Sequence, residues 1–472
     1  MTRATDPQIS FADLEFLNQS VKLDPVLQAI SNFIDSHAEL VEIVRQDLER
    51  GLKNPATGRN GLSAPQVLRS LALQRVKNWD YRELRERIAD GYTLRRFTDF
   101  YSRCVPKHDA FNRAFNRLTP DTLESINQAI VRAAVELDLE DGSKLRVDTT
   151  VVETDIHYPT DSTLLWDSVR VITRLIARLD ELLPQGVGRF ANRTRRARRR
   201  MQEIQRMTPK QRHRRQRRKY RELIRTTEQV VQKARAVLKK TSIVRGIDPI
   251  SDIAIRDLRV QIEHHCGLGL QVIDQARRRV LEQESVPNEQ KIYSIFEPHT
   301  DLIKRGKVQK PVEFGHKVFL AESARGLITQ YRVLNGNPTD EVQVRPSLKR
   351  HKQMFGEAPE LFSADRGFFS QDSVKDCQNA GVVLACIPQR GGKKTPEREV
   401  FEKSPVFKKG QRFRAGIEGR ISVLFRGRGM KRCLAQGRER FELLVGAAVL
   451  ANNLMIIAGL LIKRQQRHRR AA

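Results

Sequence analysis

Apolar residues in the first part of the chain recur at helical spacing. Up to about residue 60 the pattern is loose, and the Gly-, Pro- and Asn-containing stretch 51–61 predicts a loop. From Ser63, a favoured N-cap residue, five short helices are predicted as far as Leu137, joined by tight turns. Short helices joined in this way are typical of helix-turn-helix DNA readers and also of helical packing or dimerisation domains, and periodicity does not separate the two.

Residues 144–152 carry the first clear strand pattern. β-Branched residues dominate, and one face is formed by alternate positions: Leu145, Val147, Thr149 and Val151. Asp148 lies on the other face, where a buried carboxylate without a partner would be costly. Asp148 is therefore expected either at a sheet end near water or next to a cation.

Helical periodicity returns after this strand. Spacings of four and three residues predict a coiled-coil-like seam: Leu165, Val169, Ile172, Ile176, Leu179 and Leu183. Between Arg189 and Arg221 there are sixteen Lys or Arg residues and one acid, Glu203. A second amphipathic stretch at 220–238 then predicts an antiparallel helical hairpin with a very basic tip, followed by more helix from about 251 to 283. The charge density favours DNA phosphate contact over a merely solvated face.

Strand patterns resume in the second half of the chain, which predicts a mixed sheet interrupted by the helical insertion. Strands are expected at 292–296, 312–321, 327–334, 360–364 and 382–388, with a helix from Pro338 to about His351 between the third and the fourth. Residues 389–412 are rich in Gly and Lys and predict a flexible loop, and a helix is expected to begin near Arg414.

Two further acids occupy informative positions. Asp365 directly follows the strand expected at 360–364, and open α/β sheets place ligand groups at such carboxyl ends of strands. Glu418 lies four residues after Arg414, so both share one helix face. Taken alone, Glu418 is an ordinary intrahelical ion-pair partner. Together with Asp148 and Asp365, however, it completes the three hard carboxylates that a two-Mg²⁺ phosphoryl-transfer site requires, and Arg414 has the fork geometry that holds a phosphate.

Composition bears on partners and location. The formal net charge of +30 and the pI of about 10.4 favour a polyanionic partner over a membrane surface. The five scattered cysteines include no CxxC pair, which is typical of reduced thiols in a cytoplasm. The first residues have no apolar signal-peptide core. The uncharged stretch 443–462 just reaches membrane-spanning length, but Asn452 and Asn453 at its middle favour a helix buried in a soluble core.

Three sequence blocks together resemble the catalytic blocks of bacterial insertion-sequence DDE transposases, and the ISNCY assemblage in particular. The blocks are Val147-Asp148-Thr149-Thr150 with the downstream Tyr158-Pro159-Thr160-Asp161-Ser162, then Ser363-Ala364-Asp365-Arg366-Gly367-Phe368, then Arg414-Ala415-Gly416-Ile417-Glu418. The resemblance implies an RNase H-like catalytic domain in which Asp148, Asp365 and Glu418 are catalytic and bind metal, either Mg²⁺ or Mn²⁺, as two ions. Where related transposases often have Tyr and Lys, this chain has Gln411 and Phe425, and Arg426 and Lys431 are the candidate substitutes.

The expected fold class is therefore α/β, with an RNase H-like mixed-sheet core, a long helical insertion and a preceding all-α domain. The expected ranges are 1–140 for a helical, DNA-binding N-terminal domain, 141–162 for the first part of the core, 163–290 for the basic insertion, 291–465 for the rest of the core and 466–472 for a basic tail.

The function expected from these features is that of a DNA transposase that binds terminal inverted repeats, cleaves strands and joins them to a target. It would be a cytoplasmic, nucleoid-associated bacterial protein without a membrane role, acting on double-stranded DNA as a homodimer or larger homo-oligomer, with the 165–183 seam as a candidate interface. The predicted DNA-contacting residues are Arg414, Lys317, Arg195, Arg196, Arg198, Arg199, Arg200, Arg214, Arg215, Arg217, Arg218 and Lys219, with His316 beside Lys317.

Several alternatives remain open at the level of sequence. An RNase H-fold nuclease or resolvase would cut DNA without joining it, a catalytically silent DNA-binding regulator would do neither, and a membrane-associated basic protein is the more distant alternative. Glu153, Asp155 and Asp161 are candidate auxiliary acids, although their positions favour roles as loop or cap residues.

Overall fold

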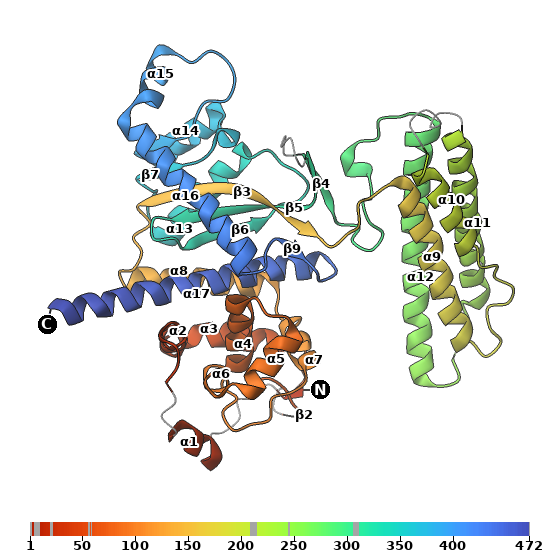
Figure 1. Ribbon diagram of the computed structural model, residues 1–472, viewed down its shortest axis with the longest axis horizontal. Helices are drawn as coiled ribbons and strands as arrows, with labels where there is room; N and C mark the ends of the chain where they lie inside the picture. The colour runs from red at the N-terminus through yellow and green to blue at the C-terminus, as the bar shows by residue number, and fades with distance from the viewer. Residues whose placement is uncertain are drawn as a thin grey trace. The chain divides into compact units, whose positions relative to one another are not determined.

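The computed structural model describes residues 2–3, 10–18, 22–54, 57, 59–207, 215–243, 246–304 and 311–471. The chain is mixed α/β with an open seven-stranded sheet, which confirms the predicted class. It divides into two compact units (Figure 1). The first contains Met1–Glu153 and His316–Ala472, and the second contains Thr154–Gly315.

The N-terminal part of the first unit is helical, apart from a parallel pair of two-residue strands, β1 (Thr2–Arg3) and β2 (Arg59–Asn60). Its helices are α1 (Phe11–Asn18), α2 (Pro25–Ser36), α3 (Ala38–Glu49), α4 (Ala64–Lys77), α5 (Tyr81–Asp90), α6 (Tyr92–Phe97), α7 (His108–Phe115) and α8 (Pro120–Glu136). Ser63 caps α4 as predicted, because its hydroxyl accepts from the backbone N–H of Gln66, while the side-chain oxygen of Gln66 accepts from the backbone N–H of Ser63.

The C-terminal helix α17 (Arg438–Ala471) belongs to the same core as these N-terminal helices. It packs beside α8, α2 and α4 (Figure 1), and Leu450, Leu454 and Ile457 are buried among them. An apolar window of this helix is long enough to cross a membrane, but 67% of that window is buried inside the protein. The prediction that residues 443–462 form a buried core helix is confirmed.

The sheet contains β3 (Lys144–Thr154), β5 (Val312–Ser323), β6 (Ile328–Val333), β7 (Leu361–Ser363), β8 (Leu384–Cys386), β4 (Asp301–Lys304) and β9 (Arg432–Cys433). Its order is β4-β5-β3-β7-β8, with β6 on β5 and β9 on β3. Strands β3, β7 and β8 run parallel, whereas β6 and β4 are antiparallel to β5. The side-chain amide of Asn453 on α17 bonds to both the N–H and the C=O of Ile328, which satisfies backbone groups of β6.

Helices α13 (Val344–Phe355), α14 (Gln371–Ala380) and α16 (Pro405–Gly427) cover the first unit's sheet, and α15 (Pro396–Lys403) packs on α16. The loop predicted at 389–412 is wrong from residue 396 onward, because α15 begins at Pro396 and α16 at Pro405. Both helices start with a capped proline turn, in which Thr395 and Ser404 accept backbone hydrogen bonds.

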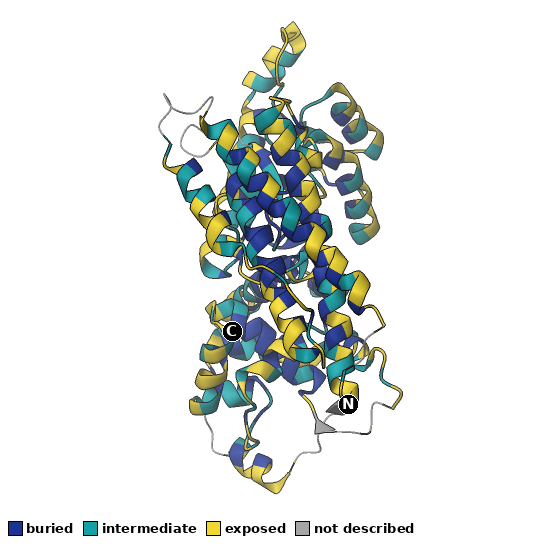
Figure 2. Cartoon of the chain, turned by 90° about the vertical axis from the view of Figure 1, so that its right-hand side faces the viewer, coloured by how far each residue is buried: buried dark blue, intermediate teal, exposed yellow. Residues whose placement is uncertain are grey.

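The second unit is a bundle of four helices, α9 (Asp161–Leu182), α10 (Thr194–Gln205), α11 (Arg217–Thr241) and α12 (Pro249–Ala276). The predicted two-helix hairpin is thus incomplete, since residues 194–205 of the arginine-rich stretch form α10, and the helix expected from about 251 to 283 is α12, which packs along α9. The apolar seam from Leu165 to Leu183 is buried in this unit's own core (Figure 2), so it is not an exposed interface.

The strand expected at 292–296 is wrong. Residues 292–296 form no regular element, and the Gln275 side chain on α12 accepts from the N–H of Ile292 and donates to its carbonyl. The apolar residues there are buried against the bundle instead, as Ile292 and Ile295 show, and the strand of this region is β4.

Candidate active site

The register of two parallel strands brings the first two predicted acids together. Arg146 on β3 pairs with Ser363 on β7, and Asp148 and Asp365 each follow two residues later. Because side chains two residues apart point to the same face, the two carboxylates emerge side by side. Asp365 lies just beyond β7 and caps the turn Arg366–Phe368, where its Oδ1 accepts from the Gly367 N–H at 2.8 Å.

Helix α16 supplies the third acid, and two anchors hold this helix on the sheet. The first is Gln411, whose Nε2 donates to the carbonyls of Ala364 at 3.2 Å and Cys386 at 2.6 Å, at the ends of β7 and β8. Gly410 permits this approach, because a Cβ there would collide with the Cys386 side chain. Gln411 thus fastens the first half of α16 to the ends of β7 and β8.

The second anchor is the fully buried carboxylate of Glu322 on β5. It accepts from Nε of Arg146 on β3 at 2.8 Å and from Nε of Arg420 on α16 at 2.9 Å. Arg146 also donates to the carbonyl of Phe413 at 2.7 Å, in space left open by Gly416, where a Cβ would collide with the guanidinium. This paired charge network fixes the rotation of α16 and therefore the direction of the side chains that follow Phe413.

The three predicted acids share one guanidinium, that of Arg414. Its Nη2 lies 2.9 Å from Oδ2 of Asp148 and 3.9 Å from Oδ2 of Asp365, and its Nη1 lies 2.8 Å from Oε1 of Glu418. The side chains become more accessible in this order, from 12% exposed for Asp148 through 37% for Asp365 to 65% for Glu418. The site is thus anchored in the sheet and open to solvent at α16.

A fourth carboxylate, that of Asp340, lies beside Asp365, and it was not predicted from the sequence as a site residue. Its Oδ1 accepts from the Thr149 hydroxyl at 2.8 Å and pairs with Nζ of Lys317 at 2.9 Å. A Cβ on Gly367 would lie 3.0 Å from both Asp340 Oδ2 and Asp365 Oδ1, which places the two acids beside each other. Asp340 follows a sheet strand in a loop, and that position is the signal that could have identified it.

The donor chemistry of this site fits Mg²⁺, which takes hard carboxylate oxygens. Asp148, Asp365 and Glu418 would hold the ion, and a bound ion would lower the pKa of a water or hydroxyl ligand and stabilise a leaving oxygen. Among the described residues, however, no three potential ligands are gathered as a ready-made metal cluster. The guanidinium of Arg414 lies among the acids instead. It shows that the acids already attract a positively charged group.

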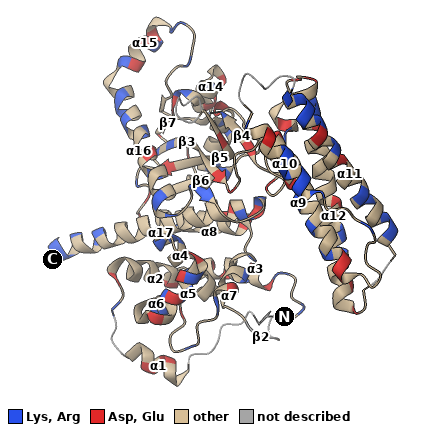
Figure 3. Cartoon of the chain, turned by 45° about the vertical axis from the view of Figure 1, so that its right-hand side comes forward, with Lys and Arg blue, Asp and Glu red and all other residues tan. Residues whose placement is uncertain are grey.

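The predicted DNA-contacting residues of the second unit differ in their exposure and in their ion pairs. Arg199, Arg200, Arg218 and Lys219 form ion pairs with Glu203 or Glu222. Arg195, Arg196 and Arg198 on α10 are exposed and have no ion pair to any described residue, and Arg215 is also exposed. Figure 3 shows Lys and Arg residues on α10. Arg217 is half-buried, and Arg214 lies outside the described residues.

Other predicted site residues have structural partners. Lys317 binds Asp340 and the Pro338 carbonyl, and His316 is buried with its ring against Phe441, so the prediction that His316 faces DNA is wrong. Phe425 packs into a core cluster, while Arg426 and Lys431 are exposed.

The candidate auxiliary acids also lie outside the cluster around Arg414. Glu153 pairs with Arg432 at 2.9 Å. Asp161 pairs with Arg279 at 2.8 Å and accepts from Gln275 in the second unit. Asp155 is exposed just after the end of β3.

No protein-family model, no curated protein and no solved structure matches this chain.

Proposed function

We propose that this protein is a DNA transposase of an insertion sequence, which binds the ends of its element and catalyses metal-dependent strand cleavage and strand transfer. The observation that carries the proposal is the convergence of Asp148, Asp365 and Glu418 on Arg414. These acids come from a strand, a strand end and a helix that are far apart in sequence, and each has a carboxylate oxygen within 3.9 Å of the same guanidinium. Such a carboxylate set suits phosphoryl transfer assisted by two metal ions.

The sheet supports an RNase H-like core in this proposal. Three strands (β3, β5 and β6) are followed by α13, β7, α14 and β8, and the parallel strands β3 and β7 direct their acids to one region. Helix α16 then covers that region from β7 and β8. This is the mixed arrangement implied by the resemblance to DDE transposases.

Within the proposal, each residue has a definite role. Asp148 and Asp365 are the fixed metal ligands, because one is held in the sheet and the other in a capped turn. Glu418 is the accessible ligand on α16. Asp340 is a positioning residue, since it holds Thr149, whose backbone N–H donates to Asp148 Oδ1 at 2.7 Å. A DNA phosphate would compete with the acids for Arg414, whereas a metal ion would compete with Arg414 for the acids.

The charge distribution supports DNA as the substrate. The net charge of +30 attracts a polyanion, and the exposed arginines of α10 provide phosphate contacts that no acid of the described chain neutralises. Phosphate contacts position DNA without reading its sequence, so recognition of the element ends is assigned to other surfaces, with the N-terminal helices as the first candidates.

Two alternatives make different predictions. A structure-specific nuclease of the same fold would cleave the DNA and leave free ends, and a catalytically silent regulator would bind without cleavage. The test is a strand assay with labelled DNA that carries the sequences flanking the gene, a target plasmid and Mg²⁺. The proposal predicts 3′-ends that become joined to the plasmid. Cleavage without joined product would support the nuclease, and binding without either product in Mg²⁺ or Mn²⁺ would support the regulator.

A further inference from the structure

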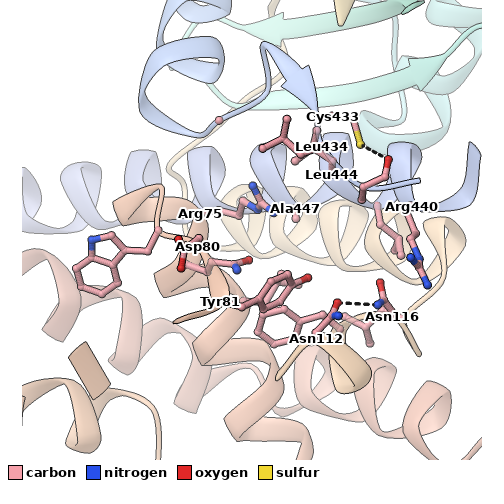
Figure 4. Close-up of a pocket in the computed structure, with 18 of the residues that line it drawn as sticks. Arg75, Asp80, Tyr81, Asn112, Asn116, Cys433, Leu434, Arg440, Leu444 and Ala447 are labelled. Atoms are coloured by element: carbon pink, nitrogen blue, oxygen red, sulfur yellow. Dashed lines mark hydrogen bonds between the residues drawn. The ribbon is translucent and has the colours of Figure 1, made fainter. Parts of the chain in front are cut away.

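A cavity of about 610 Å³ lies in the first unit (Figure 4), and none of the three acids around Arg414 lines it. Its walls come from α4, α5, α7 and α8 on one side and from the β9 region and α17 on the other. The volume is in the range of pockets that bind small molecules. No role in the proposed strand chemistry accounts for it.

The walls of this cavity are mainly apolar and partly aromatic. Trp79, Tyr81 and Phe115 line it, and the rings of Tyr81 and Phe115 lie 5.8 Å apart at an angle of 42°. Six leucines also line it: Leu71, Leu118, Leu123, Leu434, Leu443 and Leu444. Surfaces of this kind favour a flat ring, which buries apolar area and meets aromatic faces and edges.

Polar groups in the lining lack partners within the described chain. Nε of Arg75 is buried without a hydrogen bond, and the guanidinium has no ion pair to a described residue. Gln74 is 1% exposed, and its Oε1 likewise accepts no hydrogen bond. Buried polar atoms are normally satisfied, so these two atoms mark the position of a missing partner.

The cavity has positive charge and little negative charge to oppose it. Arg440 on α17 also lines it and has no ion pair within the described residues. The one acid in the lining, Asp80, already accepts from the backbone N–H groups of Arg82 and Glu83 at the start of α5. Burial lowers the pKa of Arg75, and a negatively charged ligand would offset that cost.

We infer that this cavity binds a small aromatic anion that also carries an N–H or O–H donor. The negative group pairs with Arg75 and is attracted by Arg440 on the wall that α17 forms, the ring lies among Trp79, Tyr81 and Phe115, and the donor satisfies Gln74 Oε1. This inference does not depend on the transposase proposal, because it concerns a separate cavity and an interaction that requires no DNA.

Isothermal titration of the full-length protein with three probes tests the inference. 4-Aminobenzoate carries the ring, the anion and the donor, benzoate lacks the donor, and aniline lacks the anion. For a ligand of this size, we expect a Kd for 4-aminobenzoate below about 1 mM. Benzoate should bind several-fold more weakly, and aniline should give no saturable binding at the same concentrations.

Substitutions then assign the contacts. Arg75→Gln should weaken 4-aminobenzoate binding by about tenfold or more, as expected for a lost charge-assisted hydrogen bond. Gln74→Leu should remove the preference for 4-aminobenzoate over benzoate. Lys77→Gln, an exposed change on the same helix, is the matched control and should leave the Kd unchanged.

Arg440→Gln provides a second variant at an exposed position, in case Arg75→Gln unfolds the protein. It should also weaken binding of both carboxylates. The inference is overturned if 4-aminobenzoate shows no saturable binding to the wild-type protein, or if the folded Arg75 or Arg440 variants bind it as tightly as the Lys77 control does.

Discussion

Nη2 of Arg414 on helix α16 lies 2.9 Å from Oδ2 of Asp148 on strand β3, although 266 residues separate the two in the chain. The same guanidinium reaches Asp365 and Glu418. Arg414 therefore compensates the mutual repulsion of three carboxylates, and it occupies the position at which a divalent cation would exert the same attraction. This competition leads to a prediction about metal binding that requires no DNA.

Arg414→Gln is expected to lower the melting temperature of the metal-free protein and to increase the stabilisation produced by Mg²⁺. Without the guanidinium, the acids repel one another, and a cation no longer competes with a resident positive charge. Thermal unfolding across a MgCl₂ series at constant ionic strength measures both effects. Arg412→Gln, an exposed change on the same helix, is the control and should behave like wild type. A smaller Mg²⁺ shift in Arg414→Gln than in wild type would contradict this account.

Glu322→Gln should destabilise the first unit strongly. The buried carboxylate is the common partner of Arg146 and Arg420, and its neutral analogue leaves two guanidiniums inside the protein without a counter-charge. Breaking a buried ion pair in this way costs about 3–5 kcal/mol. Urea unfolding followed by circular dichroism measures the loss. The exposed Glu357→Gln is the control, and a Glu322 variant as stable as that control would show that this network does not hold α16.

His351 on α13 should make the protein less stable in mild acid. Burial lowers the pKa of His351 to about 4 from its ordinary value of 6.5. Between these values the unfolded chain binds a proton that the folded chain does not, so stability falls as the pH decreases from 6.5 towards 4, by about 3 kcal/mol in total. In His351→Phe this contribution is absent. As the pH falls, the unfolding free energy of His351→Phe should therefore increase relative to that of the wild-type protein. A difference between the two proteins that does not change with pH would refute the assignment.

The exposed arginines of α10 should contribute to DNA affinity through phosphates. Replacing Arg195, Arg196 and Arg198 together by Gln should weaken binding to DNA of any sequence and reduce the slope of log K against log salt by about 2 to 3. Fluorescence anisotropy at several salt concentrations measures the slope. The control removes the same charge from exposed positions of α11, as Lys233, Lys239 and Lys240 to Gln. Equal losses in both triple variants would indicate a general charge effect without a defined contact surface.

The elements that carry the acids could be predicted from the sequence, because the local residue pattern of each element matches the structure that it adopts in the folded protein. Strand β3 has β-branched residues at alternate positions, and the end of β7 is marked by an acid before a glycine turn. The α/β class followed from these patterns. The convergence of Asp148 and Asp365 required the parallel register of β3 and β7, which no local pattern specifies.

The errors have a common physical origin in tertiary contacts. The apolar run at 292–296 was predicted as a strand, but Gln275 satisfies the backbone of Ile292 and the run packs on the bundle. The 389–412 stretch contains Gly and Lys residues that suggest a loop, yet caps at Thr395 and Ser404 and the contact of Gly410 with Cys386 stabilise two helices. Asp340 was overlooked because its partners, Thr149 and Lys317, are remote in sequence.

The most direct test of the central claim measures strand cleavage by three single variants, Asp148→Asn, Asp365→Asn and Glu418→Gln, on DNA carrying the element ends, with Mg²⁺. The control is Asp372→Asn, which changes a carboxylate that is 91% exposed on α14. The account predicts that each of the three variants binds the DNA as wild type does but cleaves it at least on the order of 10²-fold more slowly, and that the control cleaves normally. Wild-type rates in any one of the three would contradict the claim that these acids form a single active site.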